Sequence, residues 1–173
     1  MNIIYSEKFR QHDTGPTHPE SSDRLRAVVS HLKSGNYKNH LCWVEPEPCT
    51  IEDLLKIHTQ QHIDQIKSVC KNSGGYLDVD TPVCPESYEI ALLSAGAWVT
   101  GLNCLMANEQ PAFVLSRPPG HHAERDKAMG FCLFSNAALT ATLALEYSEI
   151  NKIAIFDWDV HHGNGTEDIV KSN

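Results

Sequence analysis

The sequence predicts an α/β domain built on a parallel sheet with helices on both faces. Two short apolar runs, residues 112–116 and 153–156, contain no charged side chain, and a helical pattern over residues 136–147 lies between them. Continuous apolar strands that alternate with helices are typical of parallel sheets whose two faces are both buried. A length of 173 residues suits one domain of ordinary size.

The N-terminal elements follow from periodicity and capping residues. Residues 2–5 are apolar enough for a short strand. From residue 22, apolar side chains recur at positions i, i+3, i+4 and i+7, which predicts a helix. Ser21 or Ser22 can cap its start, and Gly35 lies just past its end.

Three further helices are predicted before residue 112. Thr50 and Asp53 resemble a capping box that opens a short helix, and residues 63–69 form another helical stripe that ends before Gly74. A long helix is expected over residues 86–107. Its charge-free part contains serine, threonine, glycine and asparagine and has no basic flank, so we expect a buried helix and not a membrane span.

Composition limits the partners of the protein. Fourteen Lys and Arg face 22 Asp and Glu, a net charge of −8, which disfavours nucleic acid and favours a cationic small molecule or a basic peptide. The six cysteines are scattered without a CxxC pair, and the first residues lack the pattern of a signal peptide. We therefore expect free thiols and a cytoplasmic location. The sequence predicts no oligomeric state.

The acidic and histidine residues after the 153–156 run form a candidate metal site. If the chain stays extended there, Asp157, Asp159 and His161 point to one side, because side chains alternate along a strand. Mixed oxygen and nitrogen ligands suit Zn²⁺ or another first-row ion, and a set of two or three leaves a position open for catalysis. The alternatives are a solvated turn and a calcium loop, although His161 is a poor ligand for a hard cation.

A second polar cluster follows the 112–116 run. Its prolines and Gly120 stiffen a loop that presents His121 and His122 together, and adjacent imidazoles near a metal can divide proton transfers between them. Ligands of open α/β sheets sit at the carboxyl ends of strands, where both clusters lie. His58 and His62 are expected to be structural, because the pair lacks the glutamate of an HExxH motif. Cys132 is expected to be a buried thiol.

Four motifs in order carry a family resemblance: His18-Pro-Glu, Arg117-Pro-Pro-Gly-His-His, Gly130-Phe-Cys and Asp157-Trp-Asp-Val-His-His-Gly-Asn-Gly. They resemble the histone deacetylase and acetylpolyamine amidohydrolase superfamily, in the variants of its class II branch and bacterial relatives. The resemblance implies an arginase-like α/β fold, open and parallel. It also implies zinc-dependent hydrolysis of an acetylated amine, either acetyl-lysine or an acetylpolyamine.

The resemblance assigns roles to the two clusters. Asp159 and His161 match the zinc ligands. His122 matches the principal general base and acid, with His121 beside it, and Asn164 stands where some relatives have an aspartate that orients this base. Asp157 matches the residue that supports His121. With main-chain oxygens of Asp159 and His161, Asp157 also resembles a structural potassium site.

A second group of residues matches the substrate site of the family. Gly130 and Phe131 resemble the wall of the substrate tunnel, and Pro119 belongs to the same expected site. Asp80 stands where the family has an acidic rim residue that grips the substrate backbone. Arg24 matches an inner-pocket arginine, with Arg26 close by.

The family pattern continues past residue 173. Its third zinc ligand, an aspartate, and its transition-state tyrosine lie further along, so residues 1–173 match the N-terminal part of a single catalytic domain. We expect this part alone to be inactive and to hold zinc weakly. One alternative is an inactive fragment or pseudo-deacetylase that acts as a binding module. Another is an arginase-type ureohydrolase, which would want Asp-x-His-x-Asp where this chain reads Asp-x-Asp-x-His.

Overall fold

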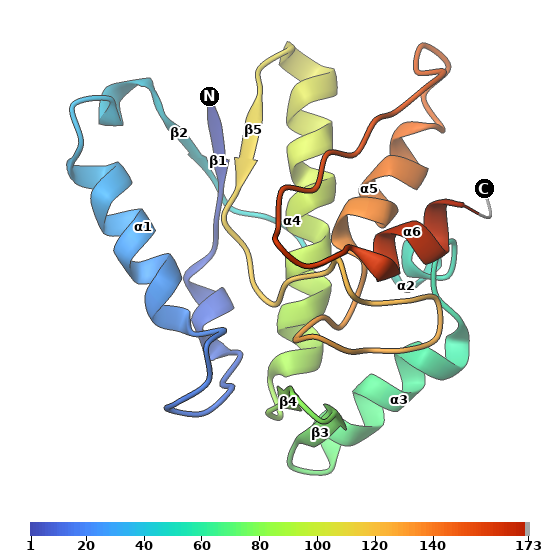
Figure 1. The fold of residues 1–173 in the computed structure, drawn as a ribbon. Coiled ribbons are helices and arrows are strands. Elements are labelled where there is room, and N and C mark those ends of the chain that lie inside the picture. The colour runs from blue at the N-terminus through green and yellow to red at the C-terminus, as the bar shows by residue number, and fades with distance from the viewer. Residues whose placement is uncertain (172–173) are drawn as a thin grey trace.

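A computed structural model describes residues 1–171 and contains a three-stranded parallel sheet (Figure 1). Its strands are β1 (Asn2–Ile4), β2 (Cys42–Val44) and β5 (Ala112–Val114), in the order β2-β1-β5. Both neighbours pair with β1 in parallel, so that Ile3 lies between Trp43 and Phe113. The predicted strands at residues 2–5 and 112–116 are confirmed. β2 was not anticipated.

Helices make up most of the remaining secondary structure. They are α1 (Ser22–Ser34), α2 (Ile51–Leu54), α3 (Gln60–Lys71), α4 (Ser87–Asn108), α5 (Asn136–Ala144) and α6 (Asn164–Val170), with 3-10 turns η1 (Glu7–Gln11) and η2 (Lys38–His40). The predicted caps are present: the Ser21 side chain accepts from the Asp23 N–H, and Thr50 accepts from the Asp53 N–H. Helix α5 ends three residues earlier than predicted.

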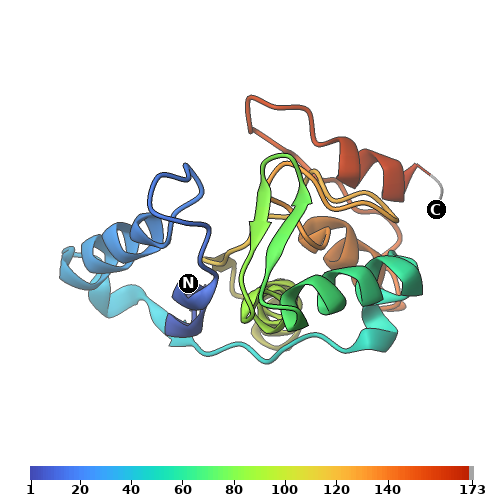
Figure 2. The ribbon, with the colours of Figure 1, turned by 90° about the horizontal axis from the view of Figure 1, so that it is seen from below.

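Helix α4 organises the packing of the domain. It contacts β1, β5, α3 and α5, and Figure 2 shows it almost end-on between α1 on one side and α3 on the other. Its length and composition would allow it to cross a membrane, but 56% of its most apolar window is buried inside the domain. The prediction of a buried helix is confirmed, because the uncharged surface of α4 packs against protein on several sides.

Both faces of the sheet are covered at its central strand β1, whereas Phe113 of β5 is 46% exposed. Ile3 and Ile4 point to opposite faces and are both 0% exposed. They belong to a cluster that also contains Leu25 of α1 and Leu93 of α4. A second cluster, on the far side of α4, includes Phe134 beside the predicted catalytic loops. The apolar core therefore extends up to the loops that follow β5.

One predicted strand is wrong. Residues 153–156 form no strand and lie largely exposed, with Phe156 88% exposed. A strand needs backbone partners, and β1 is already paired on both of its edges. Within residues 1–171, β5 has only β1 as a neighbour, and the 153–156 segment pairs with neither. A short antiparallel hairpin, β3 (Gly75–Asp78) and β4 (Thr81–Val83), was also not anticipated.

Candidate active site

Two loops meet to form the candidate site: one follows β5 and the other precedes α6 (Figure 1). Main-chain hydrogen bonds join them. The N–H groups of Gly165 and Thr166 both donate to the carbonyl oxygen of His121, at 2.9 and 3.1 Å. The first turn of α6 therefore fixes the backbone that carries the histidine pair.

Each histidine of the pair has its own partner: Asp157 in the second loop for His121, and Asn164 at the first position of α6 for His122. The Nδ1 atom of His121 lies 2.9 Å from Oδ2 of Asp157, and Nδ1 of His122 lies 2.6 Å from Oδ1 of Asn164. The two ring centroids are 3.9 Å apart. Since the partner oxygens can only accept, each Nδ1 carries a proton, and the neutral ring keeps its lone pair on Nε2.

Two glycines make room for these contacts. A Cβ atom on Gly130 would lie 2.4 Å from Cδ2 of His122, and Gly130 has a φ of +55°, which favours glycine. A Cβ atom on Gly163 would lie 2.6 Å from Oδ2 of Asp157. Larger residues at either position would displace a member of the His–acceptor pairs.

The predicted metal ligands lie next to this pair. Oδ1 of Asp159 accepts from the main-chain N–H and from Nδ1 of His161, at 2.8 and 3.0 Å, and the ring of His161 lies 6.0 Å from that of His122. The main-chain hydrogen bond from His161, followed by the side-chain one, holds the pKa of the Asp159 carboxyl below its ordinary value. An ionised carboxylate beside an imidazole is a donor set that zinc accepts.

The alternation argument for these ligands does not hold, because the chain bends at residues 159–161. Asp157 turns to His121, while Asp159 pairs with His161. Within residues 1–171, no three His, Cys, Asp or Glu side chains are grouped closely enough to hold a metal. A bound ion would therefore need at least one further ligand.

A cavity of about 970 Å³ lies beside His121. Among the predicted site residues, those that line it are Arg24, Pro119, His121, Asp157 and Asp159. Nη2 of Arg24 donates to the carbonyl oxygen of Ser116 at 3.3 Å, whereas Arg26 pairs with the exposed Asp23. Arg24 therefore lines the cavity and Arg26 does not.

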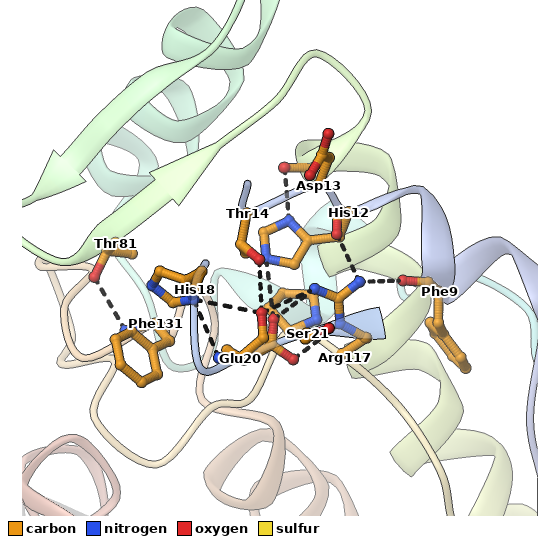
Figure 3. Close-up of polar contacts among 12 residues, drawn as sticks. Phe9, His12, Asp13, Thr14, His18, Glu20, Ser21, Thr81, Arg117 and Phe131 are labelled. Atoms are coloured by element: carbon orange, nitrogen blue, oxygen red, sulfur yellow. Dashed lines mark hydrogen bonds and ion pairs between the residues drawn. The ribbon is translucent and has the colours of Figure 1, made fainter. Parts of the chain in front are cut away.

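The other predicted substrate residues meet on the opposite side of His122, where the tip of the β3–β4 hairpin carries Asp80. The Thr81 hydroxyl donates to Oδ1 of Asp80 at 3.0 Å and accepts from the Phe131 N–H at 3.1 Å. His18 lies against the Phe131 ring, with centroids 4.6 Å apart, and its Nε2 lies 3.2 Å from the Asp80 carbonyl oxygen. Figure 3 shows His18, Thr81 and Phe131 converging.

Sequence reasoning missed the buried ion pair behind this group. Arg117 is 0% exposed, and its guanidinium binds both carboxylate oxygens of Glu20, at 2.9 and 2.6 Å (Figure 3). It also donates to the carbonyl oxygens of Phe9 and His12. Both members belong to family motifs quoted above, but only the fold shows that they meet.

Two smaller predictions are also settled. His58 and His62 stack with centroids 4.7 Å apart and bind main chain near the catalytic loops: Nε2 of His58 accepts from the Ser135 N–H, and Nε2 of His62 donates to the Leu133 carbonyl. Burial lowers the pKa of His58 to about 3, so the ring stays neutral. Cys132 is a buried thiol whose pKa is raised by desolvation to about 12.

A parallel sheet whose following loops bring paired histidines and acidic residues together defines an arginase-like α/β protein. Comparisons with known proteins agree. A family model described as Histone deacetylase domain matches residues 18–173. The crystal structure of the HDA15 HD domain superposes with a TM-score of 0.91 at 34% identity, covering 99% of this chain and 50% of that one. The chain belongs to the histone deacetylase family.

Two curated relatives illustrate the range of the match. An uncharacterized protein of Synechocystis sp. is 45% identical, with coverage of 99% of this chain and 57% of that protein. The histone deacetylase-like amidohydrolase of Pseudomonas aeruginosa is 41% identical, with coverage of 88% of this chain and 40% of that protein. The chain spans about half the length of the curated relatives it matches.

Proposed function

We propose that residues 1–173 form the N-terminal part of a single catalytic domain and that the whole protein is a zinc-dependent deacetylase. Its substrate is an acetylated amine, either acetyl-lysine or an acetylpolyamine. One observation carries the proposal: two adjacent histidines are each held through Nδ1 by an acceptor, beside an ionised carboxylate and a third imidazole. Membership of the histone deacetylase family supports it.

Asp159 and His161 are the residues that would hold the zinc ion, together with a ligand from outside residues 1–171. A zinc ion held there supplies a Lewis acid for the amide carbonyl and water that is activated near neutral pH. We also propose a structural potassium site at Asp157 with main-chain oxygens of Asp159 and His161. The family resemblance supports this second site.

The chain's own residues then move the protons. Nε2 of His122, whose lone pair faces away from Asn164, accepts a proton from the attacking water. The histidine pair, now protonated, returns a proton to the leaving amine. Asp157 holds the orientation of His121 during both transfers. By the family resemblance, a tyrosine beyond residue 173 would donate to the oxyanion, and one such donor typically contributes about 10²–10³ in rate.

The substrate is expected to enter between the hairpin tip and the histidine pair. Phe131 and Gly130 would flank its alkyl chain, and the carboxylate of Asp80 would bind the backbone or ammonium group at the rim. The net charge of −8 favours cationic amines and basic peptides as partners and disfavours nucleic acid. A cytoplasmic location is part of the same proposal.

The test is hydrolysis by the full-length protein. It is assayed on a fluorogenic acetyl-lysine peptide and on an acetylated polyamine, after chelation and again after zinc is added back. We expect turnover of at least one substrate that depends on added zinc. Zinc-loaded protein that is folded and hydrolyses neither would instead indicate an inactive homologue that serves as a binding module.

A further inference from the structure

His122 is the first of three polar side chains joined by hydrogen bonds, and the last of them is a carboxylate with no role so far. Oε1 of Glu124 accepts a hydrogen bond from Nδ2 of Asn164 at 2.8 Å. On its other side, Oδ1 of Asn164 lies 2.6 Å from Nδ1 of His122. All three side chains are half-buried, and within residues 1–171 no lysine or arginine forms an ion pair with Glu124.

The donor and acceptor chemistry along this chain permits one arrangement. An ionised carboxylate can only accept, so Glu124 requires the amide nitrogen of Asn164 to face it. The amide oxygen must then face His122. Since that oxygen can only accept, the proton of the neutral imidazole sits on Nδ1, and Nε2 is left with the lone pair. The sulfur of Met129, 3.5 Å from the same amide nitrogen, does not disturb this order.

We propose that Glu124 is a positioning residue for His122. It fixes the orientation of the Asn164 amide and thereby the tautomer in which Nε2 of His122 can accept a proton. The catalytic consequence rests on the proposed function, whereas the tautomer does not. The negative charge that asparagine lacks beside the histidine is placed one side chain further out, on Glu124.

Reversing the hydrogen-bonding character of residue 124 tests the proposal. In Glu124→Lys, the side chain can only donate, so the Asn164 amide turns its oxygen to the lysine and its nitrogen to His122. Nδ1 of His122 must then accept, and its proton moves to Nε2. We expect the ¹⁵N NMR signals of His122 in the full-length protein to change to the Nε2–H tautomer. Loss of the base should lower kcat by about 10²–10⁴-fold, with a smaller change in KM.

A second substitution should rescue the first. In Glu124→Lys combined with Asn164→Asp, the new carboxylate accepts from both the lysine and Nδ1 of His122. The Nδ1–H tautomer should return, together with most of the lost turnover. Asp126→Lys is the matched control: it makes the same charge change at an exposed position two residues away and should alter neither the tautomer nor kcat.

The outcomes separate the possibilities. An Nδ1–H signal for His122 in folded Glu124→Lys would overturn the proposal, as would a double variant that restores neither tautomer nor turnover. If Glu124→Lys does not fold, Glu124→Met removes both donor and acceptor and should give a mixture of the two tautomers; a pure Nδ1–H signal there would contradict the idea. Absence of deacetylation by the wild type would refute the proposed function and leave the tautomer measurement valid.

Discussion

Removing the Glu20 carboxylate should destabilise the protein far more than its single ion pair suggests. Glu20 binds Arg117, which is 0% exposed, through both of its oxygens. In Glu20→Ala the guanidinium would lose its counterion and keep only main-chain carbonyl oxygens as partners: those of Phe9 and His12, and that of residue 20 at 3.5 Å. Its charge would stay buried, because the arginine lies beneath the loop of residues 12–21.

The magnitude follows from burial. Removing one partner of a buried ion pair costs about 3–5 kcal/mol, since the remaining charge has lost its water and its counterion. The pair of Arg26 with Asp23 provides the contrast: its side chains are 63% and 69% exposed, and such pairs contribute about 0–1 kcal/mol. We therefore expect Glu20→Ala to lower the free energy of unfolding by several times the effect of Arg26→Ala.

Urea unfolding of the full-length variants, followed by tryptophan fluorescence, measures both effects. Replacing both members, as in Glu20→Leu with Arg117→Met, should recover part of the loss, because no charge is then left buried. Equal unfolding midpoints for Glu20→Ala and Arg26→Ala would refute the reasoning. So would a double variant less stable than Glu20→Ala.

Four further predictions concern the site and its surroundings. Asp159→Ala and His161→Ala should each lose bound zinc, and undiminished zinc by metal analysis in both would contradict the ligand assignment. His122→Ala should keep zinc but lose about 10²–10⁴ in turnover; near-wild-type turnover would point to another base. Burial lowers the pKa of His12 to about 4 from 6.5, so only the unfolded chain gains this proton as the pH falls from 6.5 to 4. The free energy of unfolding should fall in that window by up to about 1.4 kcal/mol per pH unit. His12→Gln should make the urea midpoint depend less on pH, and an unchanged pH dependence would contradict this explanation. Thr81→Val should raise KM for a peptide substrate, whereas Thr81→Ser, which keeps the hydroxyl that donates to Asp80, should not. Equal KM values for the two variants would show that this hydrogen bond does not affect substrate binding.

Sequence patterns predicted elements that depend on their own residues. Helix α4 was expected because its middle has no charge, and the caps at Ser21 and Thr50 act within one turn. The prediction of a strand at residues 153–156 was wrong because an apolar run indicates only that a segment can be buried. Whether it forms a strand depends on a neighbouring strand with which its backbone can pair. The β3–β4 hairpin escaped notice because β4 contains Pro82, a residue that cannot donate to a strand ladder and argues against a strand.

The contacts of the candidate site also divide into those that were expected and those that only the fold reveals. The family resemblance implied His121 beside Asp157 and His122 beside Asn164, and the structure places both pairs within 3 Å. The contacts of Glu124 with Asn164, of Thr81 with Phe131 and of Glu20 with Arg117 join residues 40, 50 and 97 positions apart. No local pattern encodes such pairs, because each is created by how separate loops pack.

The two hydrogen bonds from the start of α6 to the carbonyl oxygen of His121 have a consequence for protein engineering. The loop after β5 and the loop before α6 are registered against each other through main chain, independently of any side chain. Loop exchange between relatives should therefore succeed only when both loops are transplanted together with their original lengths. A one-residue insertion in either loop would move a histidine away from its acceptor while leaving every side chain of the candidate site in the sequence.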